Sequence, residues 1–219
     1  MLFRSDRGQY FKTQVINYIL PTWYCPNEER IGGFTNDGAK WICAPRLFLN
    51  KEEPCYIYSF GSNANFAFED YLSRIAQCET HIFDPTPGIQ SKLEDINLPE
   101  HYHFHFEAFG GQINKEIEIA PFGHQKTDVK PQKFQTKTLD EFVTQLQTPY
   151  IDILKIDVEG SELNDIFSTD EDSIWTQNKI GQVFIEVHLN FNDVQSFVQM
   201  FKLFDFLASH GFVLFHSVR

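Results

Sequence analysis

From residue 54 onward, short apolar runs alternate with longer stretches whose apolar residues recur every three or four positions. The short runs are typical of buried β-strands, and the longer stretches are typical of amphipathic helices. Strands are expected at 55–60, 81–84, 101–107, 150–158, 182–189 and 212–217, and helices at 64–77, 138–147 and 193–209. Strands separated by helices at this rhythm predict a parallel sheet with helices on both faces.

Residues 1–53 lack this regular alternation, and prolines and glycines are scattered between residues 21 and 45. We expect a loop-rich lead-in at 1–53, after a short helix around 10–20, that packs on a core domain at 54–219. The polar stretch 110–137 is expected to form a long loop or a small hairpin. Thr138 and Glu141 have the spacing of a capping box at the start of a helix.

The composition fits one folded domain, and the net charge limits the classes of binding partner that are expected. The chain has 219 residues, of which 42% are hydrophobic, and a formal charge of −12. Nucleic-acid backbones and anionic membranes both require a basic surface, so neither is expected as a partner. No apolar run reaches the roughly 20 residues that cross a bilayer, and residues 1–10 lack the apolar core of a signal peptide. We therefore expect a soluble chain with a neutral or cationic ligand.

Two residues at strand ends indicate a nucleoside site, because ligands of such sheets lie at the carboxyl ends of the strands. Gly61 follows the first strand, where a small residue lets the backbone approach a ligand beside a helix N-terminus. Asp84 ends the second strand, where a carboxylate can accept hydrogen bonds from ribose hydroxyls. Taken singly, Gly61 could serve only a tight turn and Asp84 only a helix cap. Together they predict a nucleoside pocket.

The loop after the first strand lacks the three glycines of the dinucleotide fingerprint, which disfavours a nicotinamide dinucleotide. A nucleoside without phosphates fits better. S-adenosylmethionine is the common cofactor of that kind and is the one expected here.

Charged residues gather at the carboxyl ends of two later strands. With a two-residue period, Lys155, Asp157 and Glu159 point to one side of the fourth strand. Glu186 and His188 repeat this arrangement on the next strand. If the two strands are neighbours, the charged groups converge into a cluster that can move protons. The other interpretation is a structural set of ion pairs at the rim of the sheet.

These segments resemble a known enzyme family. Leu154-Lys-Ile-Asp-Val-Glu-Gly-Ser-Glu162, preceded by Thr138-Leu-Asp-Glu141 and followed by Glu186-Val-His188, closely resembles the FkbM-type methyltransferases. Within that family the chain is most similar, from about residue 23 onward, to animal methyltransferase-like proteins of the secretory pathway. The matching segments are Arg30-Ile-Gly-Gly33, Asp37-Gly-Ala-Lys-Trp-Ile-Cys43, Cys55-Tyr-Ile-Tyr-Ser-Phe-Gly61, and Cys78 before Phe83-Asp-Pro85.

The resemblance implies the class I fold, a Rossmann-like three-layer sandwich around a mostly parallel sheet of six or seven strands. It also implies which residues contact S-adenosylmethionine. They are Gly61, Ser62 and Asn63 along the methionine part, Asp84 at the ribose, Glu107 and Ala108 beside the adenine, and Asp157 by the sulfonium and amino end. The loop Ser62-Asn-Ala-Asn-Phe66 departs from the glycine-rich loop of the family. The chain stops after the sixth expected strand, so an unpaired sheet edge that favours a homodimer is expected.

The expected reaction is methyl transfer to a hydroxyl of a small molecule, sugar or glycoconjugate. His188 is expected to accept the hydroxyl proton, with Glu186 orienting its ring and Asp157 as the alternative base. Lys155 would neutralise nearby carboxylates or hold an anionic acceptor. No metal ligand is assigned, and a divalent cation bridging Asp157, Glu186 and the acceptor is an alternative that nothing in the sequence demands. The rival interpretations are a methyltransferase-fold binding module without turnover and a nicotinamide enzyme.

The four cysteines can pair. Cys55 begins the first strand and Cys78 precedes the second, so a disulfide between these neighbouring strand starts is reasonable. Cys25 with Cys43 would then staple the lead-in, and buried free thiols are the alternative. Paired cysteines and the family resemblance favour the secretory lumen, and free thiols favour the cytoplasm.

Three histidines, His101, His103 and His105, alternate along the third strand. Because this strand is expected at the sheet edge, a solvated or helix-facing row is favoured over a metal site.

Overall fold

The computed structural model describes residues 19–33, 38–49, 52–121, 129–159, 161–163, 167–168, 170–190 and 193–217. The strands are β1 (Glu28–Ile31), β2 (Lys40–Cys43), β3 (Tyr56–Phe60), β4 (Glu79–Phe83), β5 (Tyr102–His105), β6 (Ala108–Phe109), β7 (Glu116–Ile119), β8 (Gln132–Lys137), β9 (Ile151–Ile156) and β10 (Ile180–Ile185). The helices are α2 (Pro45–Phe48), α3 (Ala67–Ser73), α4 (Ile89–Leu93), α5 (Leu139–Leu146), α6 (Val194–Ser209) and the 3-10 turn η1 (Ser161–Leu163). Residues 10–18 of the helix predicted around 10–20 lie outside the described residues.

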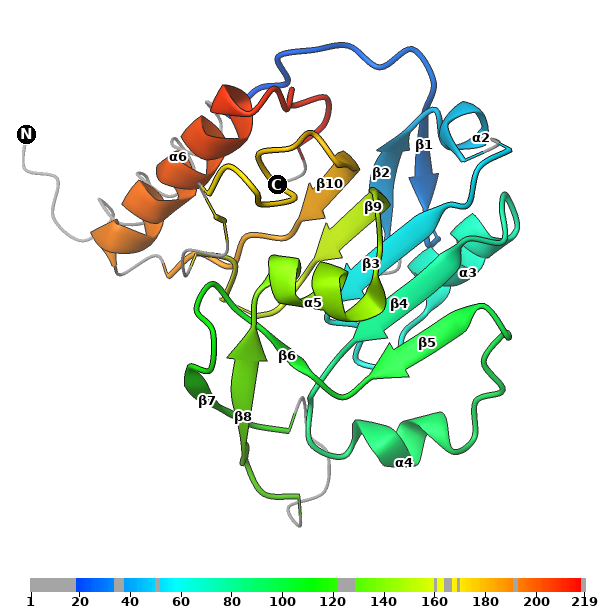
Figure 1. Ribbon diagram of the computed structural model, residues 1–219, viewed down its shortest axis with the longest axis vertical. Helices are drawn as coiled ribbons and strands as arrows, with labels where there is room; N and C mark the ends of the chain where they lie inside the picture. The colour runs from blue at the N-terminus through cyan, green and yellow to red at the C-terminus, as the bar shows by residue number, and fades with distance from the viewer. Residues whose placement is uncertain are drawn as a thin grey trace, which may run out of the picture.

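A five-stranded parallel sheet forms the middle layer of the molecule (Figure 1). Its strand order is β10-β9-β3-β4-β5, with β3 at the centre. Helix α5 crosses the front of this sheet in Figure 1, and α3 packs on the other face. The predicted parallel sheet with helices on both faces is confirmed, and the arrangement is that of a Rossmann-like fold.

The central strand separates two apolar clusters because its side chains alternate between the two faces. Tyr58 and Phe60 pack with Phe142 of α5, whereas Ile57 packs with Phe68 of α3. All five side chains are at most 1% exposed. Since full burial of one such side chain contributes about 1.5–3 kcal/mol, these contacts hold β3 firmly between the helices.

The lead-in hairpin of β1 and β2 covers the same face of the sheet as α3. Ile31 and Ile42 are completely buried in the cluster that contains Phe68. Leu49, which follows α2, is buried in the same cluster. The lead-in therefore contributes side chains to the hydrophobic core on this face of the parallel sheet.

The sixth strand predicted at 212–217 is wrong. This segment is not a strand, and its Leu214 carbonyl instead accepts hydrogen bonds from the amides of Thr22 (2.7 Å) and Trp23 (3.1 Å). Pro21, which has no N–H, cannot extend this pairing into a ladder. Among the described residues, the parallel sheet therefore has five strands rather than the six or seven expected.

The polar stretch predicted at 110–137 contains a hairpin. In it β7 pairs antiparallel with β8, and β8 also pairs in parallel with β6. The result is a small three-stranded sheet beside the main one, seen at the lower left of Figure 1. Residues 122–128 of this stretch lie outside the described residues.

The starts predicted for the helices at 138–147 and 193–209 are confirmed, whereas the helix expected at 64–77 spans only Ala67–Ser73. At α5 the Glu141 amide donates to the Thr138 hydroxyl (3.3 Å), and the Thr138 amide donates to the Glu141 carboxylate (2.8 Å). This reciprocal capping box satisfies two amides that the first turn leaves free. At α6 the Asp193 carboxylate accepts from the Gln195 amide at 2.9 Å.

Two disulfides link the cysteines as the sequence suggested. Cys25 is bonded to Cys43, and Cys55 is bonded to Cys78. The alternative of free thiols is excluded in the structure, since all four cysteines lie in its described part and all are bonded. One disulfide holds the end of β2 to the segment before β1, and the other joins the starts of β3 and β4.

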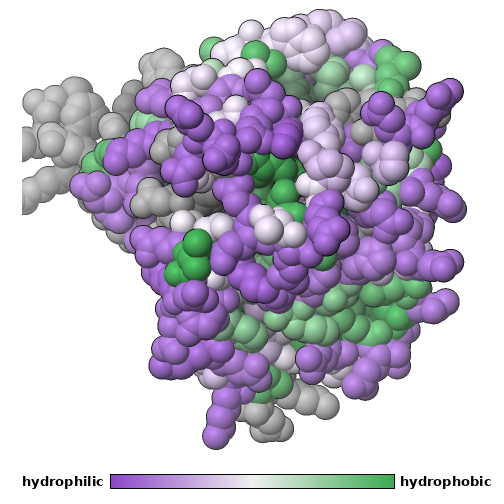
Figure 2. Space-filling view, in the orientation of Figure 1, coloured by the Kyte–Doolittle hydropathy of each residue, from purple (hydrophilic) through white to green (hydrophobic). Residues whose placement is uncertain are grey.

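The surface in the view of Figure 2 is mostly hydrophilic, with hydrophobic residues gathered in a few small areas. Within the described residues, no helix has both the length and the apolar character that crossing a membrane demands.

Three imidazoles lie together where β4 and β5 run side by side. His81 is opposite His103 in the strand register, and its Nδ1 lies 3.1 Å from Nε2 of His105. His103 in turn contacts the Glu79 carboxylate at 2.7 Å. His101, expected in the same row, instead contacts a serine of α3. Burial, together with the neighbouring His105 and His103, lowers the pKa of His81 to about 4.

The His81 imidazole should make the fold sensitive to acid. Its pKa is about 4 in the folded state against an ordinary 6.5, so the unfolded chain binds more protons between these values. The free energy of unfolding should therefore fall as the pH drops from about 6.5 toward about 4. Above about 6.5 the His81 imidazole is neutral in both the folded and the unfolded state, so it should no longer make the free energy of unfolding depend on pH. Urea unfolding of the wild type and His81→Gln at about pH 7.5 and about pH 5 measures it. The pH dependence should be smaller in His81→Gln than in the wild type. Equal pH dependence in the wild type and His81→Gln would contradict this assignment.

Candidate functional site

The carboxyl ends of β3 and β9 meet backbone to backbone at Gly61. This residue has a φ of +81°, and a Cβ atom there would lie 1.7 Å from the carbonyl oxygen of Asp157. The contact is held by a hydrogen bond from the Asp157 amide to the Phe60 carbonyl at 2.9 Å. Glycine is required at this position both by its backbone conformation and by the lack of space. It fixes how closely the two strands approach at the edge where ligands of such sheets bind.

The loop after Gly61 closes onto Asp84. One oxygen of the Asp84 carboxylate accepts hydrogen bonds from the amides of Ser62 (3.0 Å) and Asn63 (2.6 Å), and the other accepts from the amide of Thr86 (2.9 Å). Asp84 is 3% exposed, so these amides stabilise a buried carboxylate. A carboxylate has about four acceptor positions. Oδ1 receives one hydrogen bond from the described residues, so part of its acceptor capacity is not used by them.

The same loop adopts a conformation more usual for glycine. Asn63 and Ala64 have φ angles of 46° and 57°, in the left-handed region. Lys92 of α4 donates a hydrogen bond to the Asn63 side chain at 2.7 Å. The loop that departs from the glycine-rich family sequence is thus held by Asp84 and Lys92.

Glu107 and Ala108 lie just after β5. Ala108 opens β6, is 2% exposed and pairs with Thr136 of β8. Glu107 forms an ion pair with Lys137 and lies 3.5 Å from the amide nitrogen of Gln145. The structure therefore engages Glu107 with β8 and α5.

A group of charged side chains converges where β9 and β10 end. We call this group the acid–histidine cluster, and its members are Lys40, Asp157, Glu159, Glu162, Glu186 and His188. It forms because β9 and β10 are parallel neighbours, with Ile156 opposite Ile185. The structure thus brings together Asp157, Glu186 and His188, which the sequence placed at the ends of two separate strands.

Glu162 is the cluster member that orients the histidine. Its side chain is completely buried, and one oxygen accepts hydrogen bonds from the Val158 amide (2.7 Å) and from Nδ1 of His188 (3.1 Å). With its proton on Nδ1, His188 presents Nε2 to the rest of the cluster. There Nε2 lies 3.6 Å from Glu159 and 3.9 Å from Glu186. Glu186, expected to orient the ring, therefore lies on the opposite nitrogen.

The charges of the cluster shift two pKa values. Burial disfavours the protonated form of His188, but the charge and hydrogen bond of Glu162, with Glu159 and Asp157 adding, raise its pKa above the ordinary value. Burial raises the pKa of Glu159, and three neighbouring carboxylates add to it while His188 opposes it. The imidazole is therefore a stronger base than free histidine.

Lys155 has a different partner from the carboxylates expected for it, and another lysine contacts them. Lys155 is 3% exposed, and its ammonium donates to the Gly61 carbonyl at 2.7 Å. The lysine that meets the carboxylates is Lys40 of β2, at 2.5 Å from Glu186 and 3.5 Å from Asp157. Lys40 and Glu162 are the functional candidates that the sequence did not single out. Both residues stand in family segments quoted above, but Lys40 lies more than a hundred positions from both of its partners, so no local spacing connects it to them.

Three members of the cluster could also share a cation. One ligand atom each of Asp157, Glu159 and His188 lies within 4.8 Å of the others. Lys40 already brings a positive charge to Asp157. The described residues thus supply a cation of their own.

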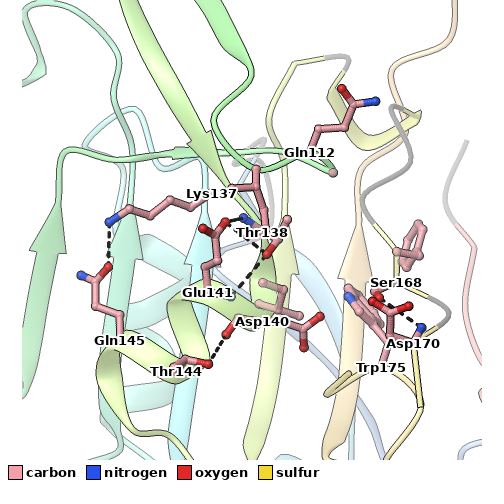
Figure 3. Close-up of a pocket in the computed structure, with 14 residues that line it drawn as sticks. Gln112, Lys137, Thr138, Asp140, Glu141, Thr144, Gln145, Ser168, Asp170 and Trp175 are labelled. Carbon is pink, nitrogen blue, oxygen red and sulfur yellow. Dashed lines mark hydrogen bonds between the residues drawn. The ribbon is translucent and has the colours of Figure 1, made fainter. Parts of the chain in front are cut away.

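A cavity of about 840 Å³ lies elsewhere, between α5, the small sheet and residues 167–175 (Figure 3). Its lining is Gly111, Gln112, Ile113, Lys137, Thr138, Leu139, Asp140, Glu141, Thr144, Gln145, Phe167, Ser168, Asp170 and Trp175. None of the site residues expected from the sequence lines it. Asp140 accepts hydrogen bonds from Ser173 and Ile174, and Lys137 donates to Gln145. The functional site is placed at the strand ends because the charged residues singled out from the sequence converge there and not in this cavity.

Comparison with known proteins identifies the family. The sequence profile of a methyltransferase-domain family matches residues 4–218, nearly the whole chain. No curated protein and no solved structure is significantly similar to the chain. The matched profile agrees with the parallel α/β sheet. The chain belongs to the methyltransferase-domain family.

Proposed function

We propose that this protein is an FkbM-type, S-adenosylmethionine-dependent O-methyltransferase. The observation that carries the proposal is the pairing of His188 with the buried Glu162, beside Asp157, at the carboxyl ends of β9 and β10. A methyl transfer to oxygen needs a base that takes the hydroxyl proton, and this pair provides an oriented one. The proposed acceptor is a hydroxyl on a small molecule, a sugar or a glycoconjugate.

The residues at the strand ends fit the cofactor. Asp84 would accept a hydrogen bond from a ribose hydroxyl at Oδ1, and Gly61 lets the loop that begins at Ser62 lie directly beside Asp157. Ser62 and Asn63 would follow the methionine part, Glu107 and Ala108 would flank the adenine, and Asp157 would face the sulfonium. S-adenosylmethionine supplies, when bound, a methyl group on a positively charged sulfur.

The proposed roles of the protein groups follow from their positions. The acceptor oxygen forms a bond to the methyl carbon as the carbon–sulfur bond breaks and its electrons return to sulfur. Nε2 of His188 takes the acceptor proton, and Glu162 stabilises the imidazolium that results. Positioning of the acceptor for in-line attack supplies much of the acceleration.

The two disulfides bear on the cellular compartment in which this reaction is proposed to take place. Cys25–Cys43 and Cys55–Cys78 are compatible with an oxidising compartment, so we propose the secretory lumen. A homodimer through the edge of the sheet is part of the same proposal. A second candidate function, a binding module without turnover, is favoured by the non-glycine loop that closes onto Asp84.

Cofactor binding should depend on Asp84. We expect calorimetric titration to give micromolar binding of S-adenosylmethionine and S-adenosylhomocysteine, as is common for nucleoside ligands (Kd on the order of 1 μM), and none of NAD. Asp84→Asn should weaken binding about tenfold or more, because a charged acceptor is lost at the ribose. Asp95→Asn, at an exposed aspartate beyond α4, is the matched control. If the folded wild type bound neither adenosyl ligand, the methyltransferase proposal would fail.

Turnover should depend on the histidine and its carboxylate. In a screen of hydroxyl acceptors with radiolabelled S-adenosylmethionine, His188→Ala should lower kcat by about 10²–10⁴-fold, the usual contribution of a general base. Glu162→Gln should lower it by a smaller factor, because the ring keeps a hydrogen-bond partner without the charge. Both variants should bind S-adenosylhomocysteine like the wild type, and Glu171→Gln, at an exposed glutamate, is the control. Full turnover in His188→Ala would assign the base elsewhere, and no turnover in the wild type with any acceptor would favour the binding module.

A further inference from the structure

Lys40 reaches the acid–histidine cluster from outside the main sheet. It is the first residue of β2 in the lead-in hairpin, and its side chain is 13% exposed. Its ammonium lies 2.5 Å from a Glu186 oxygen and 3.5 Å from an Asp157 oxygen. A single lysine thus bridges the ends of β9 and β10.

The position of Lys40 is fixed by the other end of its strand. The Cys43 amide donates to the Gln182 side chain at 3.0 Å, and the Gln182 amide nitrogen donates to the Cys43 carbonyl at 2.8 Å. This double hydrogen bond fastens β2 to β10, and the Cys25–Cys43 disulfide anchors the same residue to the segment before β1. Between the two ends, Trp41 stacks on His216 with ring centroids 4.6 Å apart. Lys40 is therefore held in place and does not merely sample the carboxylates from solvent.

The charges of the cluster are unequal. It contains the four carboxylates of Asp157, Glu159, Glu162 and Glu186, and within it Lys40 is the one ammonium group of the described residues. Glu162 is committed to His188 on the far side of the ring. The carboxylates that Lys40 contacts, Asp157 and Glu186, have side chains that are 20% and 36% exposed, whereas Glu159 is 59% exposed and lies 3.6 Å from Nε2 of His188.

We propose that Lys40 is a positioning residue that sets how strongly this site prefers the positively charged donor over the neutral thioether product. The inference rests on the proposed function, which puts Asp157 beside the sulfonium. Lys40 acts through Asp157 and Glu186, whose charge it partly neutralises.

The chemistry explains why such a residue is useful. As the carbon–sulfur bond breaks, the positive charge on sulfur disappears, so carboxylates near the sulfur stabilise the bound donor more than the transition state. Binding energy spent on the ground state in this way raises the barrier. An ammonium that offsets the two carboxylates limits this loss, and it leaves Asp157 in place to orient the donor.

The test compares the two ligands that differ in this charge. Isothermal titration at low ionic strength gives the ratio of Kd for S-adenosylhomocysteine to Kd for S-adenosylmethionine. In Lys40→Met the ratio should rise about tenfold over the wild type, because two carboxylates lose their counter-ion near the sulfonium. Lys40→Arg should keep the wild-type ratio, and Glu186→Gln should lower it. Lys133→Met, which removes an exposed lysine paired with Glu116 on the small sheet, is the matched control.

The outcomes separate this inference from the proposed function. An unchanged ratio in a folded Lys40→Met variant, with the wild type binding both ligands, overturns the role of Lys40 alone. An equal loss of affinity for both ligands also overturns it, since it would show that Lys40 only maintains the shape of the site. If the folded wild type binds neither ligand, the proposed function fails and the inference fails with it. Thermal melting of each variant verifies that it is folded.

Discussion

The backbone contact between Gly61 and Asp157 determines the geometry of the candidate site. A Cβ at position 61 would overlap the Asp157 carbonyl, so only glycine lets β3 and β9 come this close. Lys155 then caps the free Gly61 carbonyl, and the Gly61 amide bonds to the end of β4. The loop that reaches Asp84 and the strand end that carries Asp157 are thereby held side by side. Gly61 thus places the loop that contacts Asp84, where the nucleoside is proposed to bind, next to the acid–histidine cluster.

Ion pairs and hydrogen bonds stabilise the charged side chains that are buried at the carboxyl edge of the parallel sheet. Burying a carboxylate or an ammonium is costly unless it is paired or hydrogen-bonded. The Asp84 carboxylate accepts hydrogen bonds from backbone amides, the Glu162 carboxylate accepts from an amide and an imidazole, and the Lys155 ammonium donates to a carbonyl. These pairings leave Nε2 of His188 facing two other carboxylates of the cluster. The hydrogen bonds that stabilise the buried charges thus also orient the His188 imidazole next to the carboxylates of the cluster.

Local patterns in the sequence predicted the features that depend on neighbouring residues. The alternation of apolar runs gave the five parallel strands, and the Thr138–Glu141 spacing gave the capping box. The strand at 212–217 was mistaken because its apolar pattern is that of a strand, while the partner it meets contains Pro21. Lys40 could not be predicted, since its carboxylate partners come together with it only through the docking of the lead-in hairpin. The choice of Glu162 over Glu186 as the partner of Nδ1 likewise depends on the turn after β9, which no periodicity encodes.

The central claim is that the reacting groups meet at the carboxyl ends of β3, β4, β9 and β10. A crystal structure of the complex with S-adenosylhomocysteine tests it most directly. The account predicts the ribose beside Asp84 and the sulfur beside Asp157, on the side of the acid–histidine cluster to which Nε2 of His188 points. A nucleoside bound instead in the cavity between Gln112, Asp140 and Trp175 would contradict the account and move the site to the α5 side of the sheet.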